Sequence, residues 1–456
     1  MNVTLSLLAT KSAAKISQIL GRGGGALPGV IAERLDGHLS GKLAAGLTGV
    51  IVITGTNGKT TTTKLIAELL TAHGVRVVTN SSGSNLKRGV TSALIAAADM
   101  KGRVPEAVGL FEVDEASLRL VAPEIKPDHI VVTNLFRDQL DRYGELDTTA
   151  ALIGEGIAAT SAQIYLNADD PLVASLAKYA KNSASVHYYG IEGLPVNPVG
   201  MHQTVSDSDR CPVCRSRLTF SRIFYGHVGH YKCPNGDFVR PVPEVVITNV
   251  EEADRSGSKF VLALGGKRTK FTFPLPGTYN LYNALGAVSL AYGLGIATEI
   301  MRSTLANSQA AFGRVEKIEI AGRTLCLLLI KNPAGFTQVL QTFVIGREAV
   351  RVMFVINDLA ADGRDVSWLW DVPLEALAGS KPFVLTAGIR GDDMAVRLKY
   401  AGVESDSAAN LSEGIDALIA ATPIGDTAYI LPTYTAMLMI RKVLAGRSSS
   451  MQAMPR

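Results

Sequence analysis

The stretch TGTNGKTTT, near the N-terminal end of the chain, combines residue types that bind the phosphates of a nucleotide. Gly55 and Gly58 allow a tight turn with backbone N–H groups facing inward. Lys59 supplies a cation for the β- and γ-phosphates, and the hydroxyl of Thr60 or Thr61 can bind Mg²⁺. A strict Walker pattern would place a further glycine two residues before Gly55, so this loop is a shortened variant. The loop predicts a nucleotide site formed by Gly55, Thr56, Asn57, Gly58, Lys59, Thr60 and Thr61.

A buried strand at 50–54 and a helix at 60–73 are expected to position this loop. Further apolar runs alternate with helical stretches, which is typical of a parallel sheet wrapped by helices. These runs cover 75–80, 107–116, 129–136 and 162–170. Ligands bind at the carboxyl ends of such strands. Polar residues fall at these ends: Thr54, Asn80, Glu112, Asn134 and Asn167.

The composition excludes several classes of protein. The chain has 456 residues, is 47% hydrophobic and carries a net charge of +4, so it has material for large cores and no strong bias towards nucleic acid. No apolar run reaches the ~18 residues that would span a bilayer. The apolar stretch VTLSLLA is too short for a signal peptide, and no positive charge precedes it. We therefore expect a cytoplasmic protein whose N-terminal helix ends at Gly21 and Gly23–Gly25.

Three of the four cysteines cluster in a segment at about 195–245 that is rich in proline, histidine and aromatic residues. Cys211 and Cys214 are spaced to bind one tetrahedral Zn²⁺, and Cys233 offers a third sulfur. We predict a small β insert with a structural zinc site, with the alternative that the insert keeps its shape without metal. The candidates for the fourth ligand are His227, His230 and Asp237.

The motifs of the first half resemble those of the Mur ligase family, which uses ATP to turn a carboxylate into an acyl phosphate that an amine attacks. GTNGKTTT is similar to the ATP loop of the family, and FEVDEA places Glu112 at its Mg²⁺-binding glutamate, with Thr60 as the second expected Mg²⁺ ligand. GTYNLYNALGA resembles its nucleotide-contacting helix and retains Asn280 and Asn283, with tyrosine replacing a histidine. FGRVE places Arg314 where the family has an arginine that approaches the phosphates across a domain boundary.

One motif departs from the family. TNLFRDQLDRYGE resembles the DHLDRYG segment of Mur ligases, but Gln139 stands where they have a metal-linked histidine. The resemblance therefore does not carry over the second metal site of the family.

The second half narrows the resemblance to MurT-type subunits of lipid II isoglutaminyl synthases. The matching segments are IKNPAGFTQVL, INDLAADGRDVSWLWD, AGIRGDDMAVRLKYAG and PTYTAML. The resemblance implies amidation of the α-carboxylate of D-glutamate in the lipid II stem peptide, with ATP and Mg²⁺, at the inner face of the membrane. Ammonia would come from a GatD-like glutaminase partner. Asp365 would complete the catalytic triad of that partner, with Asp362 as the fallback.

These features predict an α/β protein. Its expected parts are an N-terminal helical segment at 1–49, a Mur ligase-like P-loop ATPase domain at 50–312 with a zinc-ribbon-like insert, a Rossmann-like domain at 313–446 and a tail at 447–456. Lys59, Glu112 and Asp365 are the candidate catalytic residues. One alternative is an ATP-dependent amino-acid ligase of the muropeptide or folylpolyglutamate type. Another is a nucleotide-binding assembly protein without catalysis, against which Lys59, Thr60, Glu112 and Arg314 argue.

Overall fold

The computed structural model describes residues 7, 10–12, 27–80, 84–138, 146–194, 207–310, 315–380 and 382–447. Arg314, Gln139, the tail and most of the helix expected before Gly21 lie outside these ranges. The N-terminal part that is described holds two short helices, α2 (Leu27–Leu35) and α3 (Leu39–Ala44). Within the described ranges, no helix has the length and apolar character needed to cross a bilayer.

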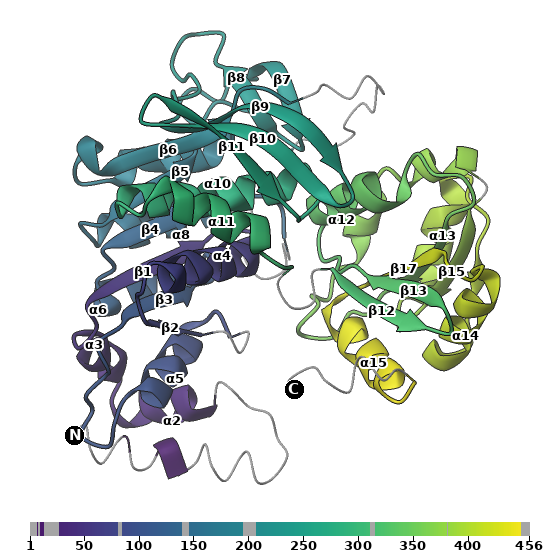
Figure 1. The fold of residues 1–456 in the computed structure, drawn as a ribbon, viewed down its shortest axis with the longest axis horizontal. Helices are drawn as coiled ribbons and strands as arrows, with labels where there is room; N and C mark the ends of the chain where they lie inside the picture. The colour runs from purple at the N-terminus through teal and green to yellow at the C-terminus, as the bar shows by residue number, and fades with distance from the viewer. Residues whose placement is uncertain are drawn as a thin grey trace.

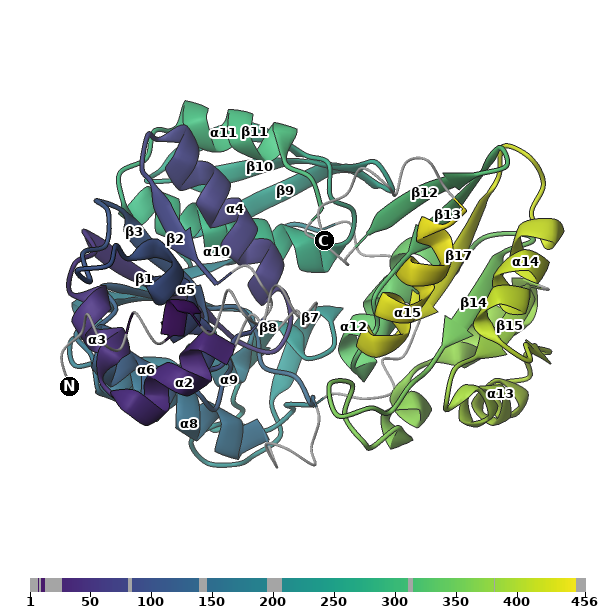
Figure 2. The ribbon, with the colours of Figure 1, turned by 90° about the horizontal axis from the view of Figure 1, so that it is seen from below.

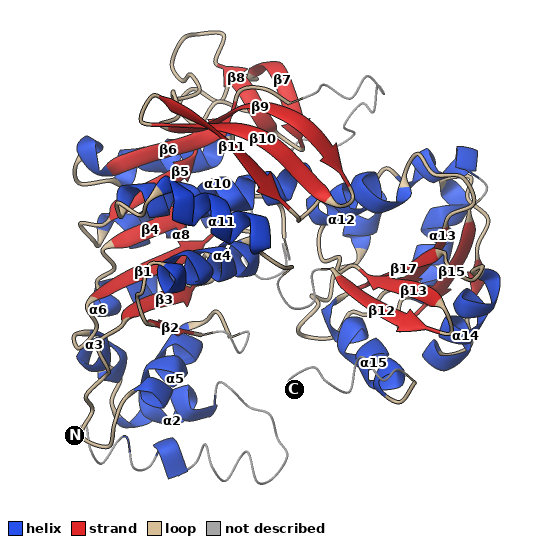
Figure 3. Cartoon of the chain, viewed as in Figure 1, coloured by secondary structure: helices blue, strands red, loops and turns tan. Residues whose placement is uncertain are grey.

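Two large sheets organise the described residues, and Figure 3 shows them as two groups of red strands. The larger sheet contains β1 (Gly49–Thr54), β2 (Val77–Thr79), β3 (Val108–Glu112), β4 (His129–Val132), β5 (Gln163–Asn167), β6 (Val186–Ile191), β9 (Val245–Asp254), β10 (Gly257–Leu264) and β11 (Lys267–Phe273). Their spatial order is β11-β10-β9-β6-β5-β4-β1-β3-β2. In this order every pair of neighbouring strands between β9 and β2 is parallel, and the chain order reverses at β1. The loop after β1 therefore lies at a switch point, where ligands bind in such sheets.

Helices cover both faces of the larger sheet (Figure 1). They are α4 (Lys59–Ala72), α5 (Lys87–Ala97), α6 (Leu118–Ile125), α8 (Leu146–Ala158), α9 (Pro171–Ser175), α10 (Thr278–Gly293) and α11 (Thr298–Asn307). Successive side chains of a strand point to opposite faces. Ile51 and Ile53 of β1 accordingly enter the core beneath α4 and α10, whereas Val50 and Val52 enter the core beneath α6 and α8. Burial on both sides fixes β1, and with it the start of the phosphate loop.

The region after residue 246 does not continue the parallel alternation of strands and helices. Here β9, β10 and β11 form an antiparallel meander before α10 begins. The connections at 255–256 and 265–266 are too short for a helical crossover, which needs a dozen or more residues. The meander extends the sheet at the edge next to β6.

The smaller sheet contains β12 (Glu316–Ile320), β13 (Arg323–Leu327), β14 (Arg351–Val355), β15 (Phe383–Ala387), β16 (Asp406–Ser407) and β17 (Thr427–Pro432). Their order is β12-β13-β17-β14-β15-β16, and only β12 is antiparallel to its neighbour within the described residues. Helices α12 (Pro333–Val339), α13 (Gly391–Tyr400), α14 (Leu411–Ala421) and α15 (Tyr434–Ala445) pack around it. Figures 1 and 2 show the two units side by side, with α12 facing the larger one.

The cysteine-rich insert forms a hairpin of β7 (Thr219–Tyr225) and β8 (Val228–Lys232), paired antiparallel. The base of the hairpin packs on a small cluster that includes Cys211, Cys233 and Tyr231. Tyr231 also donates a hydrogen bond to the carbonyl of Ala168, at 3.0 Å, which ties the hairpin to the end of β5.

Candidate active site

The backbone conformation of the phosphate loop requires glycine at two positions. Gly55 and Gly58 have φ angles of 116° and 86°. A Cβ at position 55 would lie 2.4 Å from Thr133 Oγ1, and one at position 58 would lie 1.9 Å from Asn283 Oδ1. These close approaches and the left-handed backbone exclude other residues at both positions.

The segment after β4 holds this loop in shape. The side-chain amide of Asn134 accepts a hydrogen bond from Asn57 N and donates one to Asn57 O, both at 2.9 Å. Thr133 Oγ1 donates to the same carbonyl at 2.8 Å, and Thr56 Oγ1 accepts from Phe136 N at 3.1 Å. The strand-end asparagine that the sequence singled out therefore fixes the loop itself.

Lys59 is buried at the base of the loop. Its Nζ donates to Gly55 O at 2.5 Å and lies 3.2 Å from Glu115 Oε2. Burial opposes the charge on Lys59, but the carboxylates of Glu115 and Glu112 outweigh it and raise the pKa of the lysine. The ammonium group therefore stays charged at neutral pH. Glu115 was not predicted from the sequence, where its only local signal is its place in the acidic turn that follows β3.

Glu112 ends β3 directly beside β1, because its register partner is Ile53. Asn80 binds the backbone of Glu112 on both sides, accepting from its N–H at 2.9 Å and donating to its carbonyl at 2.8 Å. Lys59 forms its ion pair with Glu115 and not with Glu112, and Glu112 is half-buried next to the loop. Thr60 is half-buried in the first turn of α4. A carboxylate and a hydroxyl at this edge are hard oxygen ligands that suit Mg²⁺.

A cleft with about 720 Å³ of empty space, partly open to solvent, lies beside the loop. Asn280 and Asn283 of α10 line it with Asn57 and Gly58, and Gln338 of α12 faces them from the smaller unit. Asn283 Nδ2 donates to Asn280 Oδ1 at 3.1 Å, and Asn280 Nδ2 donates to Pro276 O at 2.7 Å. These bonds orient both amides. Arg314, which the sequence assigns to this site, lies outside the described residues.

The smaller unit reaches the phosphate loop through two residues that the sequence analysis did not single out. Lys331 Nζ donates to Thr56 O at 3.2 Å and pairs with Asp138 Oδ2 at 2.6 Å. Asn332 Nδ2 donates to Asn57 Oδ1 at 3.0 Å. Lys331 and Asn332 follow β13 and precede Pro333 at the start of α12. A polar pair between a strand and a helix-starting proline is the signal that could have revealed them.

The two candidate aspartates of the DGRD segment have different environments. Asp362 is buried, and its carboxylate accepts hydrogen bonds from Thr435 N at 2.8 Å, Thr435 Oγ1 at 2.5 Å and Leu359 N at 3.2 Å. Asp365 is exposed and accepts one from Ser367 N at 2.8 Å. Asp362 therefore anchors the loop to α15, and Asp365 is the exposed carboxylate of the two.

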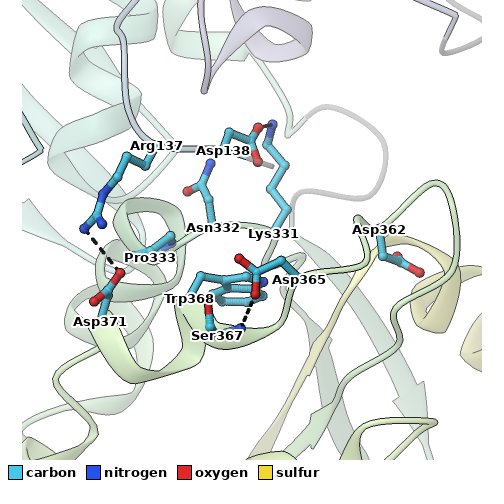
Figure 4. Close-up of a pocket in the computed structure, with 10 residues that line it drawn as sticks. All are labelled: Arg137, Asp138, Lys331, Asn332, Pro333, Asp362, Asp365, Ser367, Trp368 and Asp371. Carbon is cyan, nitrogen blue, oxygen red and sulfur yellow. Dashed lines mark hydrogen bonds and ion pairs between the residues drawn. The ribbon is translucent and has the colours of Figure 1, made fainter. Parts of the chain in front are cut away.

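A second cleft, with about 500 Å³ of empty space, lies between the two units (Figure 4). Figure 4 shows the Asp365 carboxylate over Trp368 on the side of the cavity, whereas the carboxylate of Asp362 points away. Trp368 packs edge-on against Phe336, with ring centroids 6.1 Å apart. Its ring therefore contacts the hydrophobic core of the smaller unit and also lines the cleft. Trp370 is 51% exposed.

The structure brings the three clustered cysteines together. The sulfurs of Cys211, Cys214 and Cys233 lie within 4.8 Å of one another, and an oxygen of Asp237 is 3.9 Å from the Cys233 sulfur. These donors fit a tetrahedral metal site. The other two candidate ligands, His227 and His230, are not among the residues of this cluster in the described part of the chain. His227 is buried against Phe136, with its Nε2 3.5 Å from Asp170. His230 Nε2 is 2.7 Å from Ile191 O.

The sequence matches two family models, the Mur ligase middle domain at residues 53–231 and the MurT ligase C-terminal region at residues 329–437. The MurT subunit of the glutamine-hydrolysing lipid II isoglutaminyl synthase of Streptococcus pneumoniae is 33% identical over 452 residues, 98% of each chain. Its counterpart in Staphylococcus aureus is 34% identical over 398 residues, 86% of this chain and 87% of that one.

Solved structures agree on the fold. The pseudomurein peptide ligase type C of Methanothermus fervidus has a TM-score of 0.69 at 22% identity, covering 87% of this chain and 78% of that one. MurF of Acinetobacter baumannii has a TM-score of 0.65 at 16% identity, covering 94% and 80%. A phosphate loop after a central strand, reached by a second α/β unit, is thus the architecture of a Mur-type ligase. Within that class, the chain belongs to the MurT family, given its identity to these subunits over nearly its whole length.

Proposed function

We propose that this ligase uses ATP to amidate the α-carboxylate of D-glutamate in the lipid II stem peptide, giving D-isoglutamine for peptidoglycan synthesis. The observation that carries the proposal is the contact of Lys331 and Asn332 with the phosphate loop. It places the loop at the junction of two units, so that an activated carboxylate would form between them. The activity named for the relatives supports the choice of lipid II as substrate.

The first step would make an acyl phosphate. A carboxylate oxygen of the substrate attacks the γ-phosphorus of ATP, the bond between that phosphorus and the bridging oxygen breaks, and ADP leaves. The N–H groups of Gly55–Thr61 and the Lys59 ammonium would stabilise the charge on the phosphates. Thr60 and Glu112 would hold Mg²⁺, which neutralises phosphate charge when bound.

The second step would form the amide. Ammonia attacks the acyl carbon, the C–N bond forms, the C–O bond to phosphate breaks, and inorganic phosphate leaves while the nitrogen loses a proton. Asn280 and Asn283 would contact the nucleotide, and Arg314 would approach its phosphates when the units close. We assign the units to residues 50–312 and 313–446, in line with the two sheets.

Ammonia would come from a GatD-like glutaminase partner, which hydrolyses glutamine to glutamate and ammonia. Asp365 would act as a catalytic residue in trans by orienting the histidine of the partner and stabilising its cationic form. The exposure of Asp365 and the buried anchoring of Asp362 support this choice between the two aspartates.

Two further assignments complete the proposal. Cys211, Cys214 and Cys233, with Asp237 as the fourth ligand, would hold a structural Zn²⁺. The reaction would take place in the cytoplasm at the inner face of the membrane, because lipid II is anchored there.

The direct test is product analysis by mass spectrometry with lipid II and ATP. Glutamine with the partner glutaminase should give amidated lipid II, and ammonium chloride should give the same product without the partner. If no amidated lipid II formed with either nitrogen source, the proposal would be refuted. Replacing ammonium chloride with amino acids tests the alternative of an amino-acid ligase, which would form a peptide bond instead.

A further inference from the structure

The tip of the β7–β8 hairpin, formed by Tyr225, Gly226 and His227, lies against the segment that shapes the phosphate loop. Phe136 belongs to that segment and is 2% exposed. Its ring stacks on Tyr225 with ring centroids 5.6 Å apart, and it packs against His227 with centroids 4.6 Å apart. We propose that the hairpin tip positions the nucleotide, because it holds Phe136 and Phe136 holds the phosphate loop. The inference rests on the proposed function, which requires ATP at that loop.

Phe136 reaches the phosphate loop through its backbone. Its N–H donates to Thr56 Oγ1 at 3.1 Å, and the same hydroxyl donates to the Phe136 carbonyl at 3.2 Å. Thr56 N donates to the carbonyl of Asn134, two residues earlier in the segment, at 2.8 Å. The backbone N–H groups of such a loop bind the oxygens of a phosphate. A shift of Phe136 would therefore move Thr56 and change the direction of these N–H groups.

The hairpin tip confines the ring of Phe136. A Cβ at Gly226, whose φ is 56°, would lie 2.5 Å from Cε1 of that ring. His227 is fully buried, and neither of its ring nitrogens has a hydrogen-bond partner among the described residues. Burying polar atoms without partners lowers stability, so hydrogen bonding does not explain an imidazole at this position. We infer that the ring of His227 acts as a packing surface for Phe136.

The base of the hairpin is fixed to the larger unit, so that the tip can serve as a rigid support. Asp169, which follows β5, is fully buried and accepts hydrogen bonds from Arg240 Nε at 2.5 Å and from Tyr282 OH at 2.6 Å. Its carbonyl accepts another from Gly229 N of β8 at 2.8 Å. Tyr282 belongs to α10, the helix that lines the nucleotide cleft, and Tyr225 lines the same cleft. One aspartate thus joins the insert to β5 and α10.

The test compares two hairpin glycines of the larger unit. Gly226 and Gly266 each lie in a two-residue turn between antiparallel strands, with φ angles of 56° and 81°. A Cβ at Gly226 would meet Phe136, whereas one at Gly266 would meet no atom within 4 Å. Gly226→Ala and Gly266→Ala therefore impose similar backbone strain, and only Gly226→Ala displaces Phe136.

The first measurement is the affinity of the full chain for a nucleotide. We expect Gly226→Ala to raise the Kd for the non-hydrolysable ATP analogue AMP-PNP, with Mg²⁺, about tenfold in titration calorimetry. The KM for ATP in ammonium-driven amidation should rise by a similar factor, because both values depend on the phosphate loop. The KM for lipid II should stay unchanged, and Gly266→Ala should resemble the native protein in all three values.

His227 provides a second test, which decides the question even if Gly226→Ala does not fold. His227→Ala removes the ring that packs on Phe136 and should raise the Kd for the analogue about fivefold. His227→Phe keeps an aromatic ring and should restore the native Kd. If His227→Phe binds the analogue as weakly as His227→Ala, the imidazole acts through Asp170, which lies 3.5 Å from its Nε2, and the packing role is refuted.

Two results with the glycine variants would overturn the proposal. One is a Kd for the analogue in Gly226→Ala equal to that in Gly266→Ala. The other is a lower kcat with an unchanged KM for ATP in Gly226→Ala, which would mean that the substitution only reduces the amount of folded protein. A native protein that does not bind the analogue at all would refute the proposed function itself, and the role of the hairpin tip with it.

Discussion

The loop after β1 and the loop after β14 both leave the carboxyl end of a central parallel strand, and each carries one half of the proposed chemistry. In the first loop the reactive group is hidden, because Lys59 is 6% exposed and bonded to Gly55 and Glu115. In the second loop the anchor is hidden and the reactive group is exposed, because Asp362 is buried and Asp365 is not.

This difference indicates where the ligand of each loop comes from. A loop that surrounds a nucleotide can bury its cation, since the phosphates enter the protein. A loop that lends a carboxylate to another chain must present it at the surface, and it can be rigid only if it is fixed from beneath. The following variants test whether the two loops are independent.

Asp365→Asn should have the largest effect. An amide cannot orient and stabilise the partner's histidine, so we expect glutamine hydrolysis by the complex to fall about 10³–10⁴-fold. Ammonium-driven amidation should be unaffected, because the phosphate loop is untouched. Asp392→Asn, at an exposed aspartate on α13, is the matched control. A parallel loss of ammonium-driven amidation would show that the two loops are not independent.

Lys59→Ala should give the converse result. Loss of the phosphate-binding cation should lower amidation from either nitrogen source by about 10²–10³-fold, while the partner still hydrolyses glutamine. The variant also leaves Glu115 buried without its partner, which costs about 3–5 kcal/mol of stability.

The double variant Lys59→Ala/Glu115→Gln separates these two effects. It should recover much of the lost melting temperature, measured by calorimetry, without recovering amidation. Recovery of activity together with stability would mean that Lys59 has only a structural role.

Thr435→Val tests the anchor beneath the second loop. It removes the hydroxyl that donates to Asp362 Oδ2 and keeps the backbone N–H bond. We expect glutamine-driven amidation to fall about fivefold to tenfold, with ammonium-driven amidation unchanged. Thr435→Ser restores the hydroxyl and should restore the rate. If Thr435→Ser is as slow as Thr435→Val, the hydroxyl is not the anchor.

A substitution in the cysteine cluster should affect catalysis least, because the cluster belongs to neither of the two loops. In Cys233→Ser, zinc measured by elemental analysis should drop to background and the melting temperature should fall, while ammonium-driven amidation persists. Cys326→Ala, in the core of the smaller unit, should keep its zinc. Equal zinc content in both variants would contradict the assigned site.

Whether a residue of the candidate site could be predicted depended on how far along the chain it lies from the residues that it contacts. The phosphate loop was predictable because strand, glycines, lysine and helix are contiguous, and each acts through its own backbone. Lys331 and Asn332 were missed because they meet the loop from about 275 positions away, and nothing in IKNP alone says which surface it faces. The antiparallel meander of β9, β10 and β11 was not predicted, because short apolar runs do not by themselves show whether neighbouring strands run parallel or antiparallel.

The sequence by itself determined the alternation of strands and helices and the residues of the phosphate loop, since local spacing encodes both, and its resemblance to Mur ligases indicated the class of ligase. Only the tertiary structure showed which of the two nearby aspartates has a carboxylate exposed at the surface. The carboxylate of Asp362 accepts two hydrogen bonds from Thr435, which belongs to a helix far along the chain. Only the tertiary structure showed that Glu115 pairs with Lys59 and that Asp365 and Lys331 line the same cleft. Burial and hydrogen-bond partners are properties of packing, and packing brings together residues whose separation in the sequence carries no signal of their contact.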